Sequence, residues 1–351
     1  MTRTKELLKP LAEDGAALTR EQAAEVLTEI LSGTVPEVET AALLAVMAAR
    51  GEQAPELAGF VDVMRRHVTP MPFTDAEREE LVDCVGTGGG GPQTFNISCG
   101  AALVASAAGA RVAKHGNRAV TSQCGAADVL EALGVPINLS PELAVECLRE
   151  TGFVFLFAPL YHPAMKALGP LRRALGFRTI FNLVGPLTNP AQARTQVIGV
   201  LAPSRVLLVG RTLTALGAKR AFVVHGSDGI DELTTTGESV VARIEENPEG
   251  GAPEMKAARV TPEMAGLPRT TLDHFIGGDI ATNKTLLYDV LTGIPGARRD
   301  IVLLNAAAVL VAAGLAADLK EGVAQGSEAI DSGQTAATLA KLRQFGHRHA
   351  S

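Results

Sequence analysis

The first 68 residues carry apolar side chains at helical spacing. Successive apolar positions lie three or four residues apart, so these side chains share one face of a helix. The clearest such stripe is Ala23, Val26, Leu27, Ile30 and Leu31. Thr19 precedes it, with Gln22 three residues on, which is typical of a helix start. Pro70 and Pro72 interrupt any helix, so we predict a small all-helical domain over residues 1–70.

After residue 75 the pattern changes to short apolar runs separated by alanine-rich helical stretches. The runs have the length of buried strands and occupy residues 81–85, 111–113, 153–157, 196–201 and 220–224. Strands that alternate with helices predict a mostly parallel central sheet with helices on both faces. We therefore assign residues 75–351 to a large α/β domain, with a surface loop at residues 245–253. Ligands of such sheets bind at the carboxyl ends of the strands.

Composition and charge favour small-molecule partners. With 351 residues and 46% hydrophobic content, the chain can bury a substantial core. The formal net charge of −6 provides no basic field for a nucleic-acid backbone. An anionic ligand therefore has to be held by a local cluster of basic groups.

The cysteines and apolar segments indicate a cytoplasmic protein. The cysteines form no CxxC pair and stand at Cys84, Cys99, Cys124 and Cys147. Reduced thiols are therefore expected. The first residues carry charge where a secretory signal needs an apolar core. The longest apolar run, residues 301–317, is interrupted by Asn305 and Gly314, so we predict a buried helix there rather than a membrane span.

A glycine run follows the first predicted strand and leads into a predicted helix. The run occupies residues 86–91, and the helix begins at Asn96 or Ser98. Glycines let backbone N–H groups approach an anion closely, and a helix start adds unpaired donors and the positive end of its dipole. The arrangement predicts a phosphate cradle. An ordinary Gly-rich turn is the alternative interpretation.

The glycine run also matches the GxGxxG fingerprint of dinucleotide-binding proteins. That fingerprint requires an acidic residue near the end of the next strand, where this chain has Lys114 and His115. No Asp or Glu occurs in residues 84–127. The basic residues of this span are Arg111, Lys114, His115 and Arg118. Such a composition suits a polyanion better than a ribose diol.

Further motifs make the chain similar to the anthranilate phosphoribosyltransferases. In order along the chain, the motifs occupy residues 86–89, 94–98, 114–118, 127–134, 157–159, 162–166, 178–190 and 225–232. The resemblance covers most of the chain and implies a fold of the nucleoside phosphorylase/phosphoribosyltransferase type. It also implies a helical segment near residues 163–190 that returns to the small domain, and a homodimer joined through the small domains.

The resemblance implies a reaction as well. The amino nitrogen of anthranilate attacks C1 of 5-phosphoribosyl 1-diphosphate (PRPP), which displaces pyrophosphate and gives N-(5-phosphoribosyl)anthranilate in tryptophan biosynthesis. Mg²⁺ is the implied cofactor. Because the amine is already unprotonated at neutral pH, we expect positioning and leaving-group stabilisation to dominate, and no residue is assigned as a base.

The resemblance places PRPP contacts in the large domain, on the glycine run, the helix start and the loop after the second strand. They are Gly86, Gly89, Gly90, Thr94, Asn96, Ile97, Ser98, Cys99, Lys114, His115, Gly116, Asn117, Arg118, Ala119, Val120, Thr121, Ser122 and Ala126. Lys114 is the strongest of these candidates, because it ends an apolar strand and would direct its charge into the cleft. A solvated basic loop is the alternative for the residues after it.

Two adjacent carboxylates, Asp231 and Glu232, follow the strand predicted at residues 220–224. Mg²⁺ prefers oxygen donors and usually binds through one or two carboxylates plus substrate phosphates. By the resemblance, this pair holds the metal and Ser98 supplies a further oxygen. A solvated acidic turn is the alternative.

For anthranilate, the resemblance implies contacts from Gly86, Asn117 and Arg172. Guanidinium geometry favours pairing with a carboxylate, and the adjacent Arg173 is the natural control for this role. His162 could flank the same substrate. A lone histidine before proline is more often structural, so His162 is not included.

The chain departs from the family pattern near the expected PRPP site. Gly90 stands where most members have Asp, Cys99 where Thr is usual, and Gln123 and Ala126 where Lys and Ser are common. Loss of the aspartate removes a charge near the diphosphate, so we expect Mg²⁺ dependence and PRPP affinity to differ from the norm. Cys99 still leaves its backbone N–H as a donor to the anion.

Two other functions remain open at this point. A pyrimidine-nucleoside phosphorylase shares the fold and also acts at ribose C1, but residues 178–190 argue against it. A non-catalytic nucleic-acid-binding relative is the second alternative. The negative net charge and the retained Asp231 and Glu232 argue against that function.

Overall fold

The computed structural model describes residues 2–88, 91–119, 123–247 and 249–349. The amino-terminal part consists of helices α1 (Arg3–Glu13), α2 (Arg20–Leu31), α3 (Glu37–Arg50) and α4 (Ala54–Arg66). At the start of α2, the Thr19 hydroxyl accepts from the Gln22 N–H, and the Gln22 side chain accepts from the Thr19 N–H. The predicted helix start at Thr19 is therefore confirmed.

The central sheet has the strand order β3-β2-β1-β4-β5-β6-β7. Its strands are β1 (Leu81–Gly86), β2 (Arg111–Gly116), β3 (Phe153–Phe157), β4 (Thr195–Gly199), β5 (Arg220–Gly226), β6 (Ser239–Glu245) and β7 (Glu254–Val260). Strands β1 to β5 pair in parallel, whereas β6 and β7 add an antiparallel edge. The five predicted strands are confirmed, and β6 and β7 were missed. The predicted surface loop lies between these two strands.

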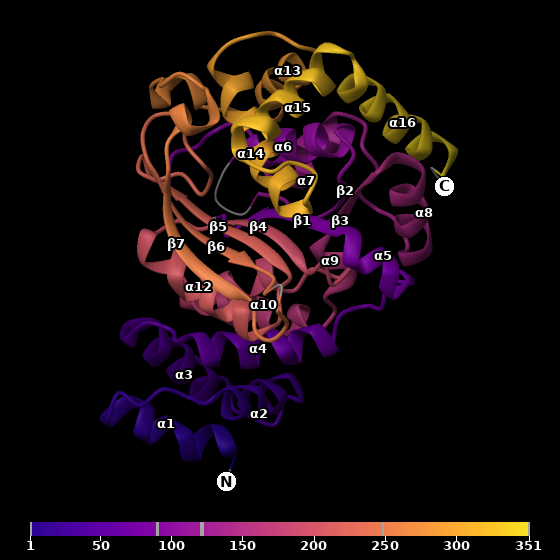
Figure 1. Ribbon diagram of the computed structural model, residues 1–351. Helices are drawn as coiled ribbons and strands as arrows, with labels where there is room; N and C mark the ends of the chain where they lie inside the picture. Colours follow the sequence, from indigo (N-terminus) through magenta and orange to yellow (C-terminus); the bar gives the residue numbers. More distant parts are fainter. Residues whose placement is uncertain (1, 89–90, 120–122, 248, 350–351) are drawn as a thin grey trace.

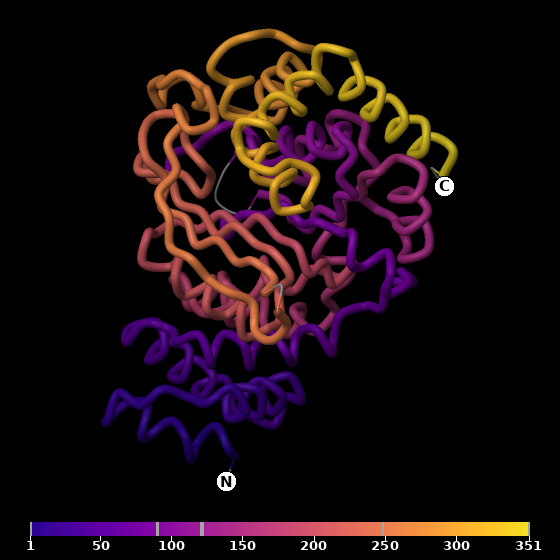
Figure 2. Tube along the Cα trace, viewed as in Figure 1, coloured from indigo at the N-terminus to yellow at the C-terminus, as the bar shows by residue number. Residues whose placement is uncertain are grey.

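Helices cover both faces of the sheet, as Figure 1 shows. On one face α6 (Ile97–Ala107) and α14 (Ala297–Ala313) pack on the strands, and α13 (Ile280–Leu291), α15 (Leu319–Asp331) and α16 (Gln334–Arg348) pack on these two helices. On the other face α12 (Pro203–Ala215) packs on the strands and α4 packs on α12, with α10 (Met165–Leu175) on the same side of the sheet. Shorter elements connect them: α5 (Asp75–Glu80), α7 (Ala126–Ala132), α8 (Pro141–Thr151), α9 (Ala158–Tyr161), α11 (Phe181–Val184), η1 (Gly185–Leu187), η2 (Pro262–Ala265) and η3 (Leu272–Phe275). Figure 2 shows the two chain ends at opposite ends of the molecule.

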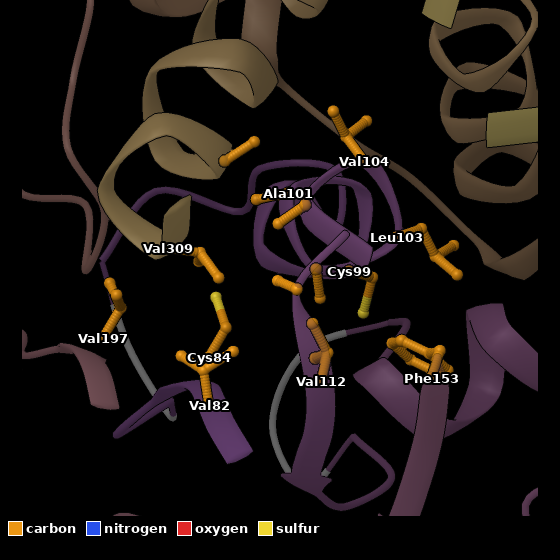
Figure 3. Close-up of a cluster of buried hydrophobic side chains, with 14 of the residues drawn as sticks. Val82, Cys84, Cys99, Ala101, Leu103, Val104, Val112, Phe153, Val197 and Val309 are labelled. Atoms are coloured by element: carbon orange, nitrogen blue, oxygen red, sulfur yellow. The ribbon is translucent and has the colours of Figure 1, made fainter. Parts of the chain in front are cut away.

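Successive side chains of a strand point to opposite faces, so each face of the sheet has its own core. In Figure 3, Val82, Val112 and Val197 point from the sheet toward Ala101 of α6 and Val309 of α14. The apolar run predicted to be a buried helix is α14. Every residue of α14 from Ile301 to Ala312 is buried. Within the described ranges, the search for a helix long and apolar enough to cross a membrane found none.

The core of the opposite face continues into the amino-terminal helices. Leu168 of α10 and Phe181 of α11 belong to the same buried cluster as Leu27 of α2 and Phe60 of α4. The rings of Phe60 and Phe181 lie 5.6 Å apart. Residues of the segment expected to return to the small domain therefore pack against its helices. The division of the chain at residues 70–75 stays a prediction.

Candidate active site

The site lies where the order of strands reverses. Strand β1 pairs with β2 on one side and with β4 on the other, and the carboxyl ends of such strands form the usual ligand crevice of an open α/β sheet. The loops that leave β1 and β5 meet there. The Gly88 N–H donates to Asp231 Oδ2 at 3.2 Å. A Cβ on Gly91, whose φ is +79°, would lie 2.7 Å from the carbonyl oxygen of Gly229.

Two strand ends have to be glycine for the loop bearing Asp231 to pack on them. A Cβ on Gly199 would lie 1.6 Å from the Asp231 carbonyl oxygen, which is an overlap of atoms. A Cβ on Gly86 would lie 2.5 Å from Asp231 Oδ2. Gly86 was predicted as a site residue, whereas Gly199 was missed. The absence of both side chains seats the Asp231 carboxylate directly above the sheet.

The structure brings Lys114, Ser98 and Glu232 together next to Asp231. Lys114 is only 1% exposed, and its Nζ lies 3.3 Å from Ser98 Oγ and also contacts the Cys84 carbonyl oxygen. Burial raises the pKa of Glu232 to about 8, with a further contribution from the charge of Asp231, and burial also raises the pKa of Asp231 above its usual range. Lys114 and hydrogen bonds from Ser98 act in the opposite direction on Glu232. Because ionisation of the buried Glu232 carboxyl is costly without a counter-charge, a cation bound beside it would stabilise the ionised form.

The donors at this place fit Mg²⁺, since they are carboxylate and hydroxyl oxygens from Asp231, Glu232 and Ser98. Among the described residues, no group of three or more His, Cys, Asp or Glu side chains gathers to hold a metal alone. Mg²⁺ usually binds through one or two carboxylates together with substrate phosphates.

The start of α6 is held by a segment from the last quarter of the chain. Asn96 is the N-cap residue of α6, as predicted. Its Oδ1 accepts from the Asn283 side chain at 3.1 Å, and Asn283 is 2% exposed. Asn283 in turn accepts from the Gly278 N–H at 2.8 Å, and Thr94 forms a backbone bridge with Ile276. Asn283 was missed, because nothing in its local sequence distinguishes it from other helix residues.

The thiol of Cys99 faces the core, not the anion site. Cys99 is fully buried on α6, and burial raises its pKa to about 11. Its backbone N–H donates to the Asn96 carbonyl oxygen at 3.1 Å. The expectation that this N–H is left as a donor for the anion is therefore wrong here, because the tight first turn of α6 engages it. Ile97 is likewise buried, with its N–H bonded to the Phe95 carbonyl oxygen at 2.7 Å.

Arg118 lies close to acidic groups in space, although its neighbours in sequence are basic. Its guanidinium pairs with Asp128 at 2.9 Å and Glu131 at 2.8 Å, both on α7. Asp128 also accepts from the N–H groups of Ala119 and Gly125, at 3.0 and 2.9 Å. The acid-free stretch of sequence is therefore partly neutralised by the helix that follows it.

The remaining predicted PRPP residues are placed as follows. Gly116 ends β2 against the Phe155 ring, Asn117 is exposed with its carbonyl oxygen accepting from the Ala127 N–H, and Ala126 begins α7. The predicted residues that lie outside the described residues are Gly89, Gly90, Val120, Thr121 and Ser122.

His115 points to the opposite face of the sheet from Lys114, as adjacent strand residues do. Its Nε2 lies 3.1 Å from Nε2 of His162, and both rings are buried. Burial holds the pKa of His115 well below its usual range and lowers that of His162 to about 4, so both rings are neutral at pH 7. His162 was left outside the predicted site, and the structure places it against a predicted residue.

Arg172 lies on α10, on the face of the sheet opposite α6 (Figure 1). Its guanidinium lies 5.7 Å from the centre of the Phe181 ring, and burial lowers its pKa. Arg173 is exposed. The two adjacent arginines thus differ in environment, and the assignment of Arg172 to anthranilate stays a prediction.

Comparison with known proteins identifies the family. Residues 5–68 match the helical bundle domain, and residues 78–336 the a/b domain, of a glycosyl transferase family. The chain is 46% identical over 328 residues to the anthranilate phosphoribosyltransferase of Rhodopseudomonas palustris strain TIE-1, covering 93% of this chain and 94% of the relative. It is 47% identical over 332 residues to that of Anaeromyxobacter sp. strain K, covering 95% of each. The chain belongs to the anthranilate phosphoribosyltransferase family.

Solved structures of anthranilate phosphoribosyltransferases share this fold. The enzyme of Thermus thermophilus superposes with a TM-score of 0.88 at 41% identity, covering 99% of this chain and 100% of that one. The enzyme of Saccharomyces cerevisiae, in complex with PRPP and Mg, gives a TM-score of 0.85 at 25% identity and 98% coverage of each chain. The predicted family and fold class, a helical domain followed by a mostly parallel α/β domain, are confirmed.

A buried carboxyl lies in β1, below the glycine run. Asp83 is fully buried, and its Oδ1 accepts from the His115 N–H at 3.0 Å. Burial raises its pKa to about 6, although the hydrogen bonds and the charge of Lys114 act against the shift. Sequence reasoning used Asp83 only to mark the edge of the acid-free span.

We expect Gly199→Ala to lower the free energy of unfolding by about 3 kcal/mol. The added Cβ would overlap the backbone of Asp231, and a backbone atom cannot move aside as the end of a flexible side chain can. Gly185→Ala is the control, since a Cβ there meets nothing within 4 Å and its φ is −49°. Urea unfolding of both variants measures the difference. Equal losses would show that the close approach at Gly199 does not constrain the loop.

We expect the Asp83 carboxyl to make stability depend on pH. Its pKa is raised in the folded state, so its contribution is fully present below about pH 4 and is lost as pH rises through about 6. Relative to Asp83→Asn, which does not titrate, the wild type should lose about 3 kcal/mol between these limits. Urea unfolding from pH 4 to 7.5 tests this. A constant difference between the two proteins would contradict the buried, protonated carboxyl.

Proposed function

We propose that this chain is a Mg²⁺-dependent anthranilate phosphoribosyltransferase. It transfers the 5-phosphoribosyl group from PRPP to the amino nitrogen of anthranilate, giving N-(5-phosphoribosyl)anthranilate and pyrophosphate in tryptophan biosynthesis. The observation that carries this function is the carboxylate pair Asp231 and Glu232, seated on glycine strand ends beside the start of α6. The identity to the anthranilate phosphoribosyltransferases over nearly the whole chain supports it.

The proposed PRPP site combines the glycine run, the start of α6 and the end of β2. Asp231, Glu232 and Ser98 would hold Mg²⁺, which neutralises charge that accumulates on the leaving pyrophosphate. Lys114 adds a fixed positive charge from below, held by the Cys84 carbonyl oxygen and Ser98. The other PRPP residues predicted from the sequence, including those outside the described ranges, belong to the same proposal.

In the proposed reaction the protein acts mainly by positioning the two substrates, and no residue acts as a general base. The amine of anthranilate is already unprotonated, so it needs only to be held in line with C1 and the leaving group. The His115 and His162 rings fit this scheme, since burial lowers the pKa of both and makes them weak bases, and they face one another on the side of the sheet away from Lys114. Gly86, Asn117 and Arg172 would line the path of anthranilate.

The assembly and location of the protein belong to the same proposal. The first residues form a helical bundle that family members carry in common. We expect two copies to join through this bundle as a homodimer, and we expect the protein to work in the cytoplasm, where PRPP and anthranilate are the small-molecule partners.

The test of this function is the loss of anthranilate fluorescence on mixing the protein with PRPP and Mg²⁺. We expect a loss that stops when Mg²⁺ is chelated, because the two carboxylates and the diphosphate are all anionic and need a cation between them. Asp231→Asn is the matched variant and should lower kcat/KM by about 100-fold or more. No loss of fluorescence over a wide range of protein concentration would exclude the function.

We expect Arg172→Ala to raise KM for anthranilate by about tenfold or more, because it removes a charge-assisted pair with the substrate carboxylate. Arg173→Ala is the control, since Arg173 is the exposed neighbour on the same helix. Steady-state kinetics with varied anthranilate at saturating PRPP separates the two. Equal effects would mean that Arg172 does not bind the carboxylate.

A further inference from the structure

A single buried amide interrupts the apolar surface of α14. Asn305 is 1% exposed and is surrounded along the helix by buried residues from Ile301 to Ala312. Its Oδ1 accepts from the Leu233 N–H at 2.9 Å, and its Nδ2 donates to the carbonyl oxygens of Leu233 and Ile301, each at 2.9 Å. Both donors and the acceptor of the amide are therefore used.

The Asn305 side chain forms hydrogen bonds with both the N–H and the C=O of Leu233, as the backbone of a neighbouring β-strand would. Both the N–H and the C=O of one buried residue are satisfied by one side chain, where unpaired groups would be costly. Leu233 directly follows Glu232, so the amide fixes the backbone at the carboxyl end of the pair Asp231–Glu232. Some other bonds of this loop are internal, such as those from the Thr234 and Thr236 hydroxyls to Asp228 at 2.6 and 2.8 Å.

Asn305 also connects the loop of the carboxylates to α14, which contacts another part of the site. Helix α14 packs directly on α6, whose first turn carries Ser98, as Figure 3 illustrates for Val309 of α14 and Ala101 of α6. A rigid α14 therefore sets the distance between the loop of Glu232 and the oxygen of Ser98. The glycine contacts of Gly86 and Gly199 hold the same loop from the side of the sheet.

We propose that Asn305 is a positioning residue that holds Asp231 and Glu232 in the arrangement needed to bind Mg²⁺ with a diphosphate. The inference rests on the proposed role of these carboxylates. Residues that orient metal ligands typically change metal affinity by about 10- to 100-fold when they are replaced. Asn305 touches neither substrate nor metal, so its effect is exerted through the Leu233 backbone.

The experiment measures Mg²⁺-dependent binding of inorganic pyrophosphate by calorimetry, which needs no turnover. Asn305→Ala removes all three hydrogen bonds and should raise the Mg²⁺ concentration for half-maximal binding by about tenfold or more. Hydrogen exchange of the Leu233 amide should become faster as well. In kinetics, KM for PRPP should rise while KM for anthranilate stays unchanged.

Leu303→Ala is the matched control. Leu303 lies two residues away on α14, is 3% exposed and contacts the region of Gly326 on α15, so its truncation destabilises the same helix without touching Leu233. It should lower Tm and leave the Mg²⁺ requirement unchanged. An equal shift in both variants would show that Asn305 only stabilises the fold, and would overturn the proposal.

The outcomes separate this inference from the proposed function. If the wild type shows no Mg²⁺-dependent pyrophosphate binding, the carboxylate site itself is refuted, and the inference falls with it. If the wild type binds and Asn305→Ala binds equally well, only the inference is overturned. Should Asn305→Ala not fold, Asn305→Asp decides by the same criterion, since it keeps the volume and the acceptor for the Leu233 N–H and loses the amide donor.

Discussion

The whole site depends on one close approach, that of the Asp231 backbone to the ends of β1 and β4. A side chain on Gly199 would occupy the space of the Asp231 carbonyl oxygen, and one on Gly86 would meet its carboxylate. The order of strands reverses here, and both strand ends are glycine, so the loop that carries Asp231 can pack directly against the backbone of the sheet. Glu232 directly follows Asp231, so its position beside Ser98 and Lys114 depends on that contact.

Strand alternation lets β2 serve two faces of the sheet with neighbouring residues. Lys114 points toward α6 and the carboxylates, whereas His115 points toward His162 and the side that carries α10. The two buried bases differ in charge. The acidic groups around Lys114 raise its pKa although burial opposes them, whereas burial lowers the pKa of both histidines. Lys114 therefore keeps its charge on the side of the carboxylates, and the two histidine rings are neutral on the other side.

The sequence predicted those features of the site that depend on residues adjacent in the chain. Short stretches of adjacent residues predicted the start of α6 and the strand near Lys114. Asn96 is the N-cap of α6, which begins at Ile97, between the two predicted starts, and Lys114 lies inside β2, which continues to Gly116, beyond the strand end predicted at residue 113. Gly199, Asn283 and Asn305 were missed because their importance arises from contacts with segments far away in the chain. Arg118 shows the same limit, since its acidic partners lie beyond the basic span. Strand β6 was also overlooked, although its sequence contains the β-branched residues Val240, Val241 and Ile244.

The residues that hold the proposed anion site in place lie late in the sequence. Thr94 and Asn96 are held by residues 275–283, and Leu233 by Asn305, whereas the glycine run belongs to the first third. During synthesis the run therefore leaves the ribosome long before the residues that fix its neighbours. Assembly of the site is thus a late event in folding, and truncation from α13 onward would remove function by withdrawing the support that Asn283 gives to Asn96, 187 residues earlier.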